Sequence, residues 1–213
     1  MLTRALPLGA VVLFLLICLV WRSWLQYRRY GTTGIVLSRT KKRGEIIRDL
    51  LFMGLFAALI LQTIVFLLVP QWLAGLAIPF LSTLPSYLGL GVFAMGFALM
   101  VAAQLGMGSS WRIGIDETAA PGLVTGGLYR LCRNPIYLGL FVMLFGLTLL
   151  LATWVSLALT IGLILLTRFQ TLQEEQYLRR TYGAAYNQYA ARVGRFVPGL
   201  GRLEQTASDE TPT

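Results

Sequence analysis

Apolar residues occur along the chain in long runs that polar segments separate. The runs cover Ala5 to Trp21, residues 50–69, Tyr87 to Met107, Pro135 to Trp154, and Val155 to Thr167. A helix of about 20 apolar residues crosses the hydrocarbon core of a bilayer, and the first four runs are long enough to do so. The fifth run is shorter and follows the fourth directly, which predicts a tight helical hairpin over residues 135–167 that tilts or locally thins the bilayer. The pattern predicts an all-α integral membrane protein with five transmembrane helices.

Composition agrees with a membrane protein and excludes several kinds of site. Apolar residues make up 56% of the chain and charged residues 13%, whereas soluble domains carry about 25% charged residues. The chain has no histidine, which excludes Ser-His-Asp catalysis, histidine-based zinc proteases and histidine-ligated haem. Its two cysteines, Cys18 and Cys132, are too far apart for a CxxC motif. We therefore expect neither a metal site nor a disulfide framework.

The basic residues predict how the helices are oriented. All of the 18 Lys and Arg residues except Arg4 lie in the polar segments after the first, third and fifth runs. The positive-inside rule then places the N-terminus outside and the C-terminus in the cytoplasm. The cluster Arg39, Lys41, Lys42 and Arg43 would attract anionic lipid headgroups. These two effects account for the net charge of +9 without nucleic acid as a partner.

The same pattern divides the chain into three parts. Residues 1–107 hold three helices and a basic cytoplasmic loop at 22–48, residues 108–198 hold the hairpin and most of the candidate chemistry, and residues 199–213 are predicted to be a disordered tail. In the third run, Ala94, Ala98 and Ala102, with Gly91 and Gly96 beside them, form a stripe of small residues that predicts close helix packing. Gln62 and Gln104 are predicted to form hydrogen bonds between helices.

Two polar segments carry the candidate chemistry. In the first, Pro135 suits the opening turn of a helix and Asn134 suits its N-cap. The positive end of that helix, together with Arg133, favours a bound anion, although the same residues also suit an ordinary helix start. In the second, Glu174 and Glu175 point about 100° apart on a helix. One of them can therefore face inward toward a cation, or both can pair with surface arginines such as Arg179 and Arg180. We expect the thiol of Cys132 to be unreactive.

These segments resemble the family of integral-membrane methyltransferases typified by isoprenylcysteine carboxyl methyltransferase and by phospholipid methyltransferases. The resemblance covers about residues 108–198. The motifs that carry it, in chain order, are Leu123-Val124-Thr125-Gly126-Gly127-Leu128-Tyr129-Arg130, Arg133-Asn134-Pro135-Ile136-Tyr137-Leu138-Gly139, Glu174-Glu175-Gln176-Tyr177-Leu178, Tyr182-Gly183-Ala184-Ala185-Tyr186-Asn187-Gln188-Tyr189, and Val197-Pro198.

The resemblance implies that the chain binds S-adenosylmethionine at the cytoplasmic membrane face. The candidate cofactor-binding residues are Leu123, Val124, Tyr129, Arg133, Asn134, Pro135, Tyr137 and Glu174, and the candidate catalytic residues are Arg168 and Glu175. Two positions depart from the family pattern. Asn134 stands where the family usually has histidine, and Gln170 stands where it tends to have an arginine associated with the substrate. Either Arg168 takes over from that arginine, or the methyl acceptor is not a carboxylate.

The expected function is methyl transfer from S-adenosylmethionine to a lipophilic acceptor that enters from the bilayer. A prenylcysteine-like carboxylate, another lipid and a thiol all remain open as acceptors, and a bacterial or archaeal cell membrane is the expected location. One alternative is an NADPH-dependent reductase of the sterol-reductase type, which would need Arg130, Arg133, Arg179 and Arg180 around the phosphate. The other is a non-enzymatic scaffold or channel subunit, although no Asp, Glu, Lys or Arg lies inside any predicted span, whereas a transport pathway usually requires such residues.

Overall fold

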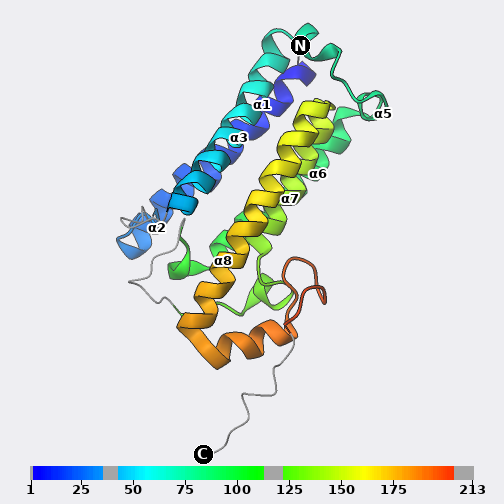
Figure 1. The fold of residues 1–213 in the computed structure, drawn as a ribbon. Helices are drawn as coiled ribbons and strands as arrows, with labels where there is room; N and C mark the ends of the chain where they lie inside the picture. The colour runs from blue at the N-terminus through cyan, green and yellow to red at the C-terminus, as the bar shows by residue number, and fades with distance from the viewer. Residues whose placement is uncertain (1, 36–42, 113–121, 204–213) are drawn as a thin grey trace, which may run out of the picture.

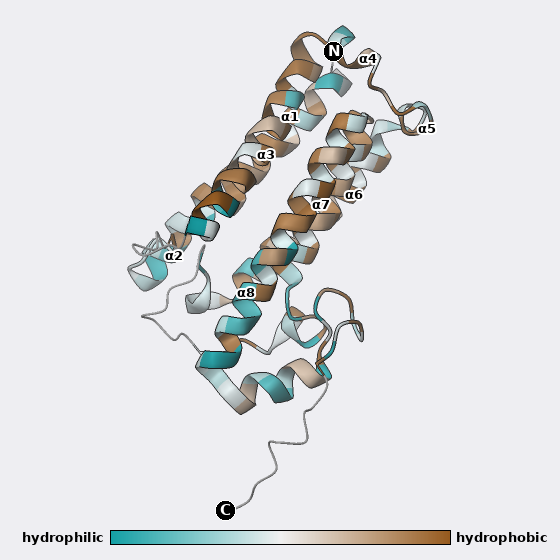
Figure 2. Ribbon diagram, viewed as in Figure 1, coloured by the Kyte–Doolittle hydropathy of each residue, from teal (hydrophilic) through white to brown (hydrophobic). Residues whose placement is uncertain are grey.

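The computed structural model describes residues 2–35, 43–112 and 122–203, and within these ranges the chain is helical with no β-sheet. Long helices run side by side in an apolar bundle, and the loops and the end of the last helix gather at one end (Figure 1). Figure 2 shows hydrophobic residues along the bundle and hydrophilic residues concentrated at that gathered end. We call it the polar end.

The first predicted run is part of a longer helix than expected. Helix α1 (Leu2–Phe14), a π-helical segment (Leu15–Trp21) and α2 (Arg22–Tyr30) follow one another without a break. The helix ends at Gly31, which adopts the left-handed conformation with φ 73° that glycine tolerates best. The start of the predicted loop 22–48 is therefore helical. Most of the predicted lipid-binding cluster, including Arg39, Lys41 and Lys42, lies outside the described residues.

The remaining helices follow the other predicted runs. They are α3 (Arg43–Leu68), the short α4 (Gln71–Ala74) and α5 (Pro79–Ser82), α6 (Ser86–Gly106), α7 (Pro135–Leu151) and α8 (Trp154–Arg192), with single 3₁₀ turns at Gly108–Ser110 and Gly127–Arg130. The N-terminal helix, α3, α6 and α8 are long and apolar enough to cross a membrane, whereas α7 is apolar but has 17 residues. The chain is thus a multi-pass membrane protein, and a fifth span and the orientation stay predictions.

The predicted hairpin is present, and a polar turn closes it. Ala152, with φ 50° and ψ 42°, ends α7, and Thr153 caps α8. The Thr153 hydroxyl accepts a hydrogen bond from the Ser156 N–H at 3.1 Å, and the Ser156 hydroxyl accepts one from the Thr153 N–H at 3.3 Å. This reciprocal capping satisfies two backbone donors at the helix start. The Gln62 amide on α3 also donates to the Thr153 hydroxyl, which confirms the predicted interhelical role of Gln62.

Helix α8 does not stop at Thr167, where the apolar run ends. It continues through 39 residues in all and bends at Gly183, where φ is 51° and ψ is −125°. Side chains with a Cβ avoid this region of backbone conformation, so glycine makes the bend possible. After the bend, Tyr186, Tyr189 and Ala190 form a second small apolar core at the polar end.

Helices α6 and α7 pack closely through glycines, including the predicted Gly96, but not through the predicted alanines. Ala94, Ala98 and Ala102 are exposed. The contact instead uses Gly89 and Gly96 on α6 and Gly139 and Gly146 on α7. A Cβ at Gly96 would lie 2.4 Å from the Met143 backbone nitrogen, and a Cβ at Gly146 would lie 2.3 Å from that of Phe93. The alanine prediction was wrong because helical spacing defines a stripe of small residues without showing which side of the helix meets a neighbour.

Candidate functional site

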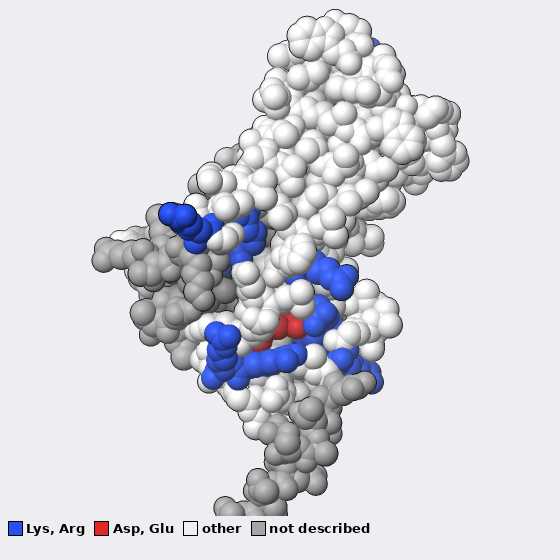
Figure 3. Space-filling model, in the orientation of Figure 1, with Lys and Arg blue, Asp and Glu red and all other residues white. Residues whose placement is uncertain are grey.

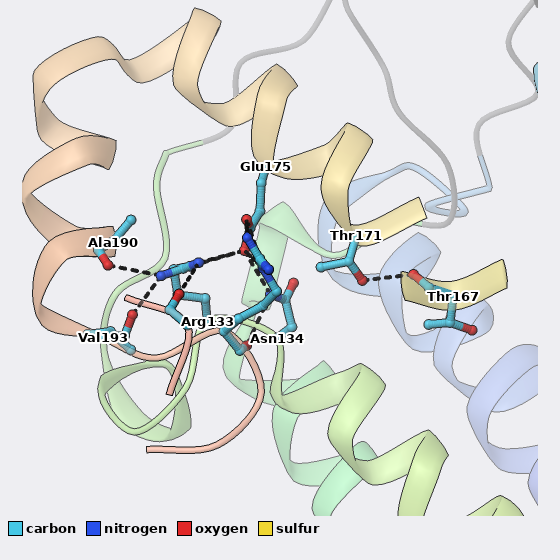
Figure 4. A network of polar contacts seen from close by, with 9 residues as sticks. Arg133, Asn134, Thr167, Thr171, Glu175, Ala190 and Val193 are labelled. Carbon is cyan, nitrogen blue, oxygen red and sulfur yellow. Dashed lines mark hydrogen bonds and ion pairs between the residues drawn. The ribbon is translucent and has the colours of Figure 1, made fainter. Parts of the chain in front are cut away.

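The predicted site residues converge at the polar end. The start of α7, the middle of α8, the loop before α7 and the chain after α8 meet there, and Figure 4 shows Arg133, Asn134 and Glu175 pointing toward one another from these elements. Figure 3 shows Lys and Arg side chains gathered over this end, around a small acidic surface, while the bundle above is almost free of charge on the visible face.

Arg133, Glu175 and Arg195 form one buried ionic network. The Arg133 Nη2 atom lies 2.9 Å from Glu175 Oε1, and the Arg195 Nη2 atom lies 2.9 Å from Glu175 Oε2. The Arg133 and Glu175 side chains are only 2% and 4% exposed. Buried charges are stable only when they are paired and hydrogen-bonded, so the three side chains must stay together. The network therefore joins the loop before α7, the middle of α8 and the chain after α8.

All five N–H donors of Arg133 are used within the protein. Nε and Nη2 donate to Glu175, Nη1 donates to the carbonyl oxygens of Ala190 and Val193, and Nη2 also donates to the carbonyl of Gly201. The sequence predicted that Arg133 helps to bind an anionic group of the cofactor. In this structure, Arg133 has no free N–H donor for that role. Gly201 and Leu203, which packs on the second core, thus make contacts within the first part of the segment 199–213 that the sequence predicts to be a disordered tail.

Asn134 begins α7, but its side chain does not cap the helix as predicted. Its amide nitrogen lies 3.1 Å from the Arg195 carbonyl and 3.4 Å from Glu175 Oε1, and no side-chain hydrogen bond to the helix amides is formed. The backbone explains the difference, since Asn134 N–H donates to the Arg195 carbonyl and Arg133 N–H to that of Gly194. These bonds hold Asn134 toward the C-terminal segment. Pro135 does occupy the first helical turn, as predicted.

Glu174 belongs to a different cluster from Glu175. Its Oε1 atom accepts hydrogen bonds from the Tyr137 hydroxyl at 2.7 Å and from the Gln170 amide at 3.0 Å. Gln170 also donates to the Tyr137 hydroxyl at 3.3 Å. Both donors are neutral, and among the described residues Glu174 takes part in no salt bridge. The half-buried Glu174 carboxylate is thus oriented by neutral groups.

Two arginines from other elements act on Glu174 at longer range. Burial raises the pKa of the Glu174 carboxyl, and Arg48 on α3 and Arg112 in the segment after α6 partly oppose this shift by attracting its negative charge. Arg48 is anchored by a 2.8 Å ion pair to Asp49 and by a hydrogen bond to Gln173 on α8. The Arg112 guanidinium lies over the Tyr177 ring, 5.8 Å from its centroid. The sequence did not single out either arginine for this cluster, since nothing in the spacing along the chain indicates that they meet.

The loop before α7 forms the apolar side of the site. Tyr129 is buried, its hydroxyl donates to the Ala103 carbonyl on α6, and its own carbonyl accepts from the Tyr189 hydroxyl at 2.6 Å. Burial raises the pKa of the Tyr129 hydroxyl and that of the Cys132 thiol, because both groups lose hydration of their charged forms. Leu123 packs on the second core, and Leu123 and Val124 are half-buried.

Arg168 lies apart from these clusters. It is exposed on α8. Residues two positions apart on an α-helix are separated by about 200° around the axis, so Arg168 points away from Gln170. The structure therefore brings Tyr137, Gln170 and Glu174 together without Arg168. The functional candidates that sequence reasoning missed are Arg195, which completes the Glu175 network, and the longer-range Arg48 and Arg112. Among the described residues there is no cluster of potential metal ligands.

The region that holds most residues of these clusters is similar to known proteins. The family described as phospholipid methyltransferase matches residues 84–185. The protein-S-isoprenylcysteine O-methyltransferase of Schizosaccharomyces pombe is 32% identical over 113 residues, which is 51% of this chain and 48% of the yeast protein. The protein-S-isoprenylcysteine O-methyltransferase A of Arabidopsis thaliana is 32% identical over 117 residues, 53% of this chain and 59% of the plant protein.

A solved structure shows that the similarity extends to the fold. The chain superposes on a eukaryotic intramembrane Ras methyltransferase, isoprenylcysteine carboxyl methyltransferase, with a TM-score of 0.61 and 20% identity, over 95% of this chain and 70% of that one. The chain spans about half the length of the two relatives matched by sequence. Both are eukaryotic and lend no support to the expected bacterial or archaeal membrane. The resemblance predicted from the motifs is confirmed: residues 84–185 match the phospholipid methyltransferase family, and about half of the chain is similar in sequence to protein-S-isoprenylcysteine O-methyltransferases.

Proposed function

We propose that the protein is an S-adenosylmethionine-dependent methyltransferase of the membrane, with its site at the polar end. The observation that carries the proposal is the Glu174 carboxylate, which neutral donors orient and which forms no salt bridge among the described residues. S-adenosylmethionine bears a sulfonium and an ammonium group, and a half-buried carboxylate that forms no salt bridge with the described residues suits such a cationic ligand. The residues present therefore fit the cofactor.

Several residues would hold the cofactor in this site. Glu174 would bind its ammonium group or its ribose hydroxyls, with Tyr137 and Gln170 fixing the carboxylate. Leu123, Val124 and Tyr129 would form an apolar wall for the adenine. Arg133, Asn134 and Glu175 would act one layer further out, because their hydrogen bonds set the start of α7 and hence the place of Tyr137. We therefore assign Glu175 a positioning role in place of the catalytic role that the sequence suggested.

The reaction asks little acid–base chemistry of the chain. When bound, S-adenosylmethionine supplies an electrophilic methyl group on a positively charged sulfur. The protein must align a nucleophile with that group and exclude water, and alignment alone can lower the barrier by roughly 7–11 kcal/mol. Carboxylates and thiolates need no histidine base. The absence of histidine is compatible with acceptors of both kinds.

The acceptor is proposed to be lipophilic and to reach the site from the bilayer. The names of the relatives favour a prenylcysteine carboxylate. Gln170 cannot supply a charge to such a carboxylate and Arg168 points away, whereas Arg48 and Arg112 lie on the side of the Tyr137–Gln170–Glu174 cluster. A carboxylate acceptor would therefore pair with Arg48 on α3 or with Arg112 in the segment after α6. Anionic lipids would bind the surface arginines. We also propose the cytoplasmic orientation that the positive-inside rule predicts.

Equilibrium binding to the detergent-purified protein tests the cofactor directly. We expect S-adenosylmethionine to bind and NADPH not to bind. Binding of NADPH alone would favour the reductase, and binding of neither by folded protein would favour the scaffold. Incorporation of a labelled methyl group into N-acetyl-S-farnesylcysteine, compared with its methyl ester and with phospholipid vesicles, then tests the acceptor. Labelling of the free acid but not of the ester would support the carboxylate.

A further inference from the structure

The N-terminal helix reaches into the polar end, although it lies outside residues 84–185, which match the family. We call residues 22–34, which comprise α2 and the turn after it, the N-terminal arm. The arm contributes two deeply buried polar side chains, Arg22 at 2% exposure and Gln26 at 1%. Polar groups of this size are buried only where they have partners. Their partners lie in and directly after the last turn of α6.

Arg22 binds the C-terminal end of α6. Its Nη2 atom donates to the carbonyl oxygens of Gln104, at 3.1 Å, and Gly108, at 3.2 Å, and α6 ends at Gly106. The last carbonyls of a helix lack intrahelical donors and form the negative end of its dipole. A buried guanidinium satisfies both needs. Gln26 accepts from Arg22 Nη1 at 2.8 Å and donates to the Ser109 carbonyl at 3.1 Å.

The arm also encloses Trp111. The Arg22 guanidinium lies over the Trp111 ring, 4.3 Å from its centroid, and Trp111 is 3% exposed. Gly34 also lies against this side chain, so closely that a Cβ at that position would be 2.7 Å from the ring. Cation–π contact strengthens when the cation is desolvated. Trp111 is therefore fixed by two residues of the arm.

Fixing Trp111 has a consequence for the next residue. Arg112 follows it directly, lies over the Tyr177 ring and attracts the charge of Glu174. The path from Arg22 through Trp111 and Arg112 thus connects the N-terminal helix to Tyr177 on α8, which lies about one helical turn after Glu174. Each step is a contact or a peptide bond in the described part of the chain.

We propose that Arg22 is a positioning residue: it holds residues 108–112 so that Arg112 stays over the Tyr177 ring, next to the Tyr137–Gln170–Glu174 cluster. The effect of Arg22 on ligand affinity rests on the proposed function, whereas its effect on the segment does not. Arg22 touches neither Glu174 nor Tyr177 and acts through Trp111. The N-terminal helix is accordingly part of the site and more than a membrane anchor.

The test compares Arg22→Gln and Arg22→Lys with Arg28→Gln in the full chain. Arg28 is a matched control, because it lies on the same helix over an exposed tryptophan, Trp24, at 5.0 Å. Hydrogen exchange over residues 108–112, S-adenosylmethionine affinity and thermal stability are measured for each. We expect Arg22→Gln to speed exchange and to weaken affinity by about tenfold, in the range of mutations that act through a coupled element. Arg22→Lys keeps the charge but not the planar fork and should be intermediate.

The outcomes separate the proposals. Faster exchange and weaker affinity for the Arg22 variants, with Arg28→Gln unchanged, support the positioning role. Faster exchange with unchanged affinity, or unchanged exchange, overturns it. If the wild-type protein binds no S-adenosylmethionine, the proposed function fails, and the exchange rates alone decide whether Arg22 holds the segment. Should Arg22→Gln fail to fold, Gln26→Ala removes the bond to Ser109 more gently and is held to the same two readouts.

Discussion

The guanidinium of Arg133 and the carboxylate of Glu175 form a buried ion pair, with 2.9 Å between Nη2 and Oε1. This pair fixes the start of α7 against the middle of α8. The two adjacent glutamates therefore have different partners. Glu175 pairs with the arginines, whereas Glu174 accepts hydrogen bonds from Tyr137 and Gln170. The Tyr137 and Gln170 side chains thus orient the first glutamate within the structure that the second one maintains.

Glu175→Gln should destabilise the fold. It would leave Arg133 buried without its counter-ion, and breaking a buried pair from one side costs about 3–5 kcal/mol. Thermal unfolding in detergent measures the effect. Glu174→Gln is the control, since it removes the neighbouring charge without breaking a salt bridge. Equal melting temperatures for the two variants would contradict the structural role of Glu175.

Glu174→Gln should weaken S-adenosylmethionine binding while the protein stays folded. Replacing a charged hydrogen-bond acceptor costs about 1.5–3 kcal/mol, which is roughly tenfold or more in affinity. Tyr137→Phe should have a smaller effect, because Gln170 still orients the carboxylate. Titration calorimetry on both variants decides the matter, and wild-type affinity in Glu174→Gln would remove this residue from the cofactor site.

Gly96→Ala should separate α6 from α7. The added Cβ would lie 2.4 Å from the Met143 backbone nitrogen, and overpacking of this kind costs typically 1–3 kcal/mol. Gly91→Ala on the same helix is the matched control. Its Cβ would meet nothing within 4 Å, and alanine favours the helix over glycine by about 1 kcal/mol. The two substitutions should shift the melting temperature in opposite directions, and parallel shifts would argue against the glycine contact.

Cys132 should react slowly with alkylating reagents. Burial raises the pKa of its thiol above the ordinary 9.0, so the folded protein holds less of the reactive thiolate at any pH below that value. By the same linkage, the stability that the protonated thiol contributes is complete below the ordinary pKa and is lost as the pH rises through the folded one. Iodoacetamide labelling in a Cys18→Ser background measures this, with denatured protein as the reference. Equal rates in the two states would contradict the burial.

The sequence predicted the helices well because the signal is physical and local. A bilayer requires long apolar runs, and each predicted run corresponds to a helix. Prediction from the sequence failed where a contact with another part of the fold determines which way a side chain faces. The alanines at 94, 98 and 102 have the spacing of a packing stripe, yet they face outward, and Gly89 and Gly96 make the contact. Asn134 has the side chain of an N-cap, yet the Arg195 carbonyl and Glu175 take its amide.

For the site, the motifs identified the segments that come together in the structure. They did not show which side chains in those segments contact each other. The motif does not reveal that Glu175 pairs with the arginines at 133 and 195 while Glu174 faces Tyr137 and Gln170. Arg195 lies 20 residues beyond Glu175, and the bend at Gly183 brings it back. Arg22 and Arg48 come from helices that the family match does not cover, so no motif could have pointed to them.

By itself, then, the sequence determined that this chain is a helical membrane protein with its polar chemistry on both sides of one hairpin, since hydrophobic runs and motif order are properties of the chain alone. Only the tertiary structure decided which glutamate is held by arginine, which stripe of small residues is buried, and that the N-terminal helix contacts the site. Those choices depend on contacts between residues far apart in sequence, where close packing and the pairing of buried charges select one arrangement.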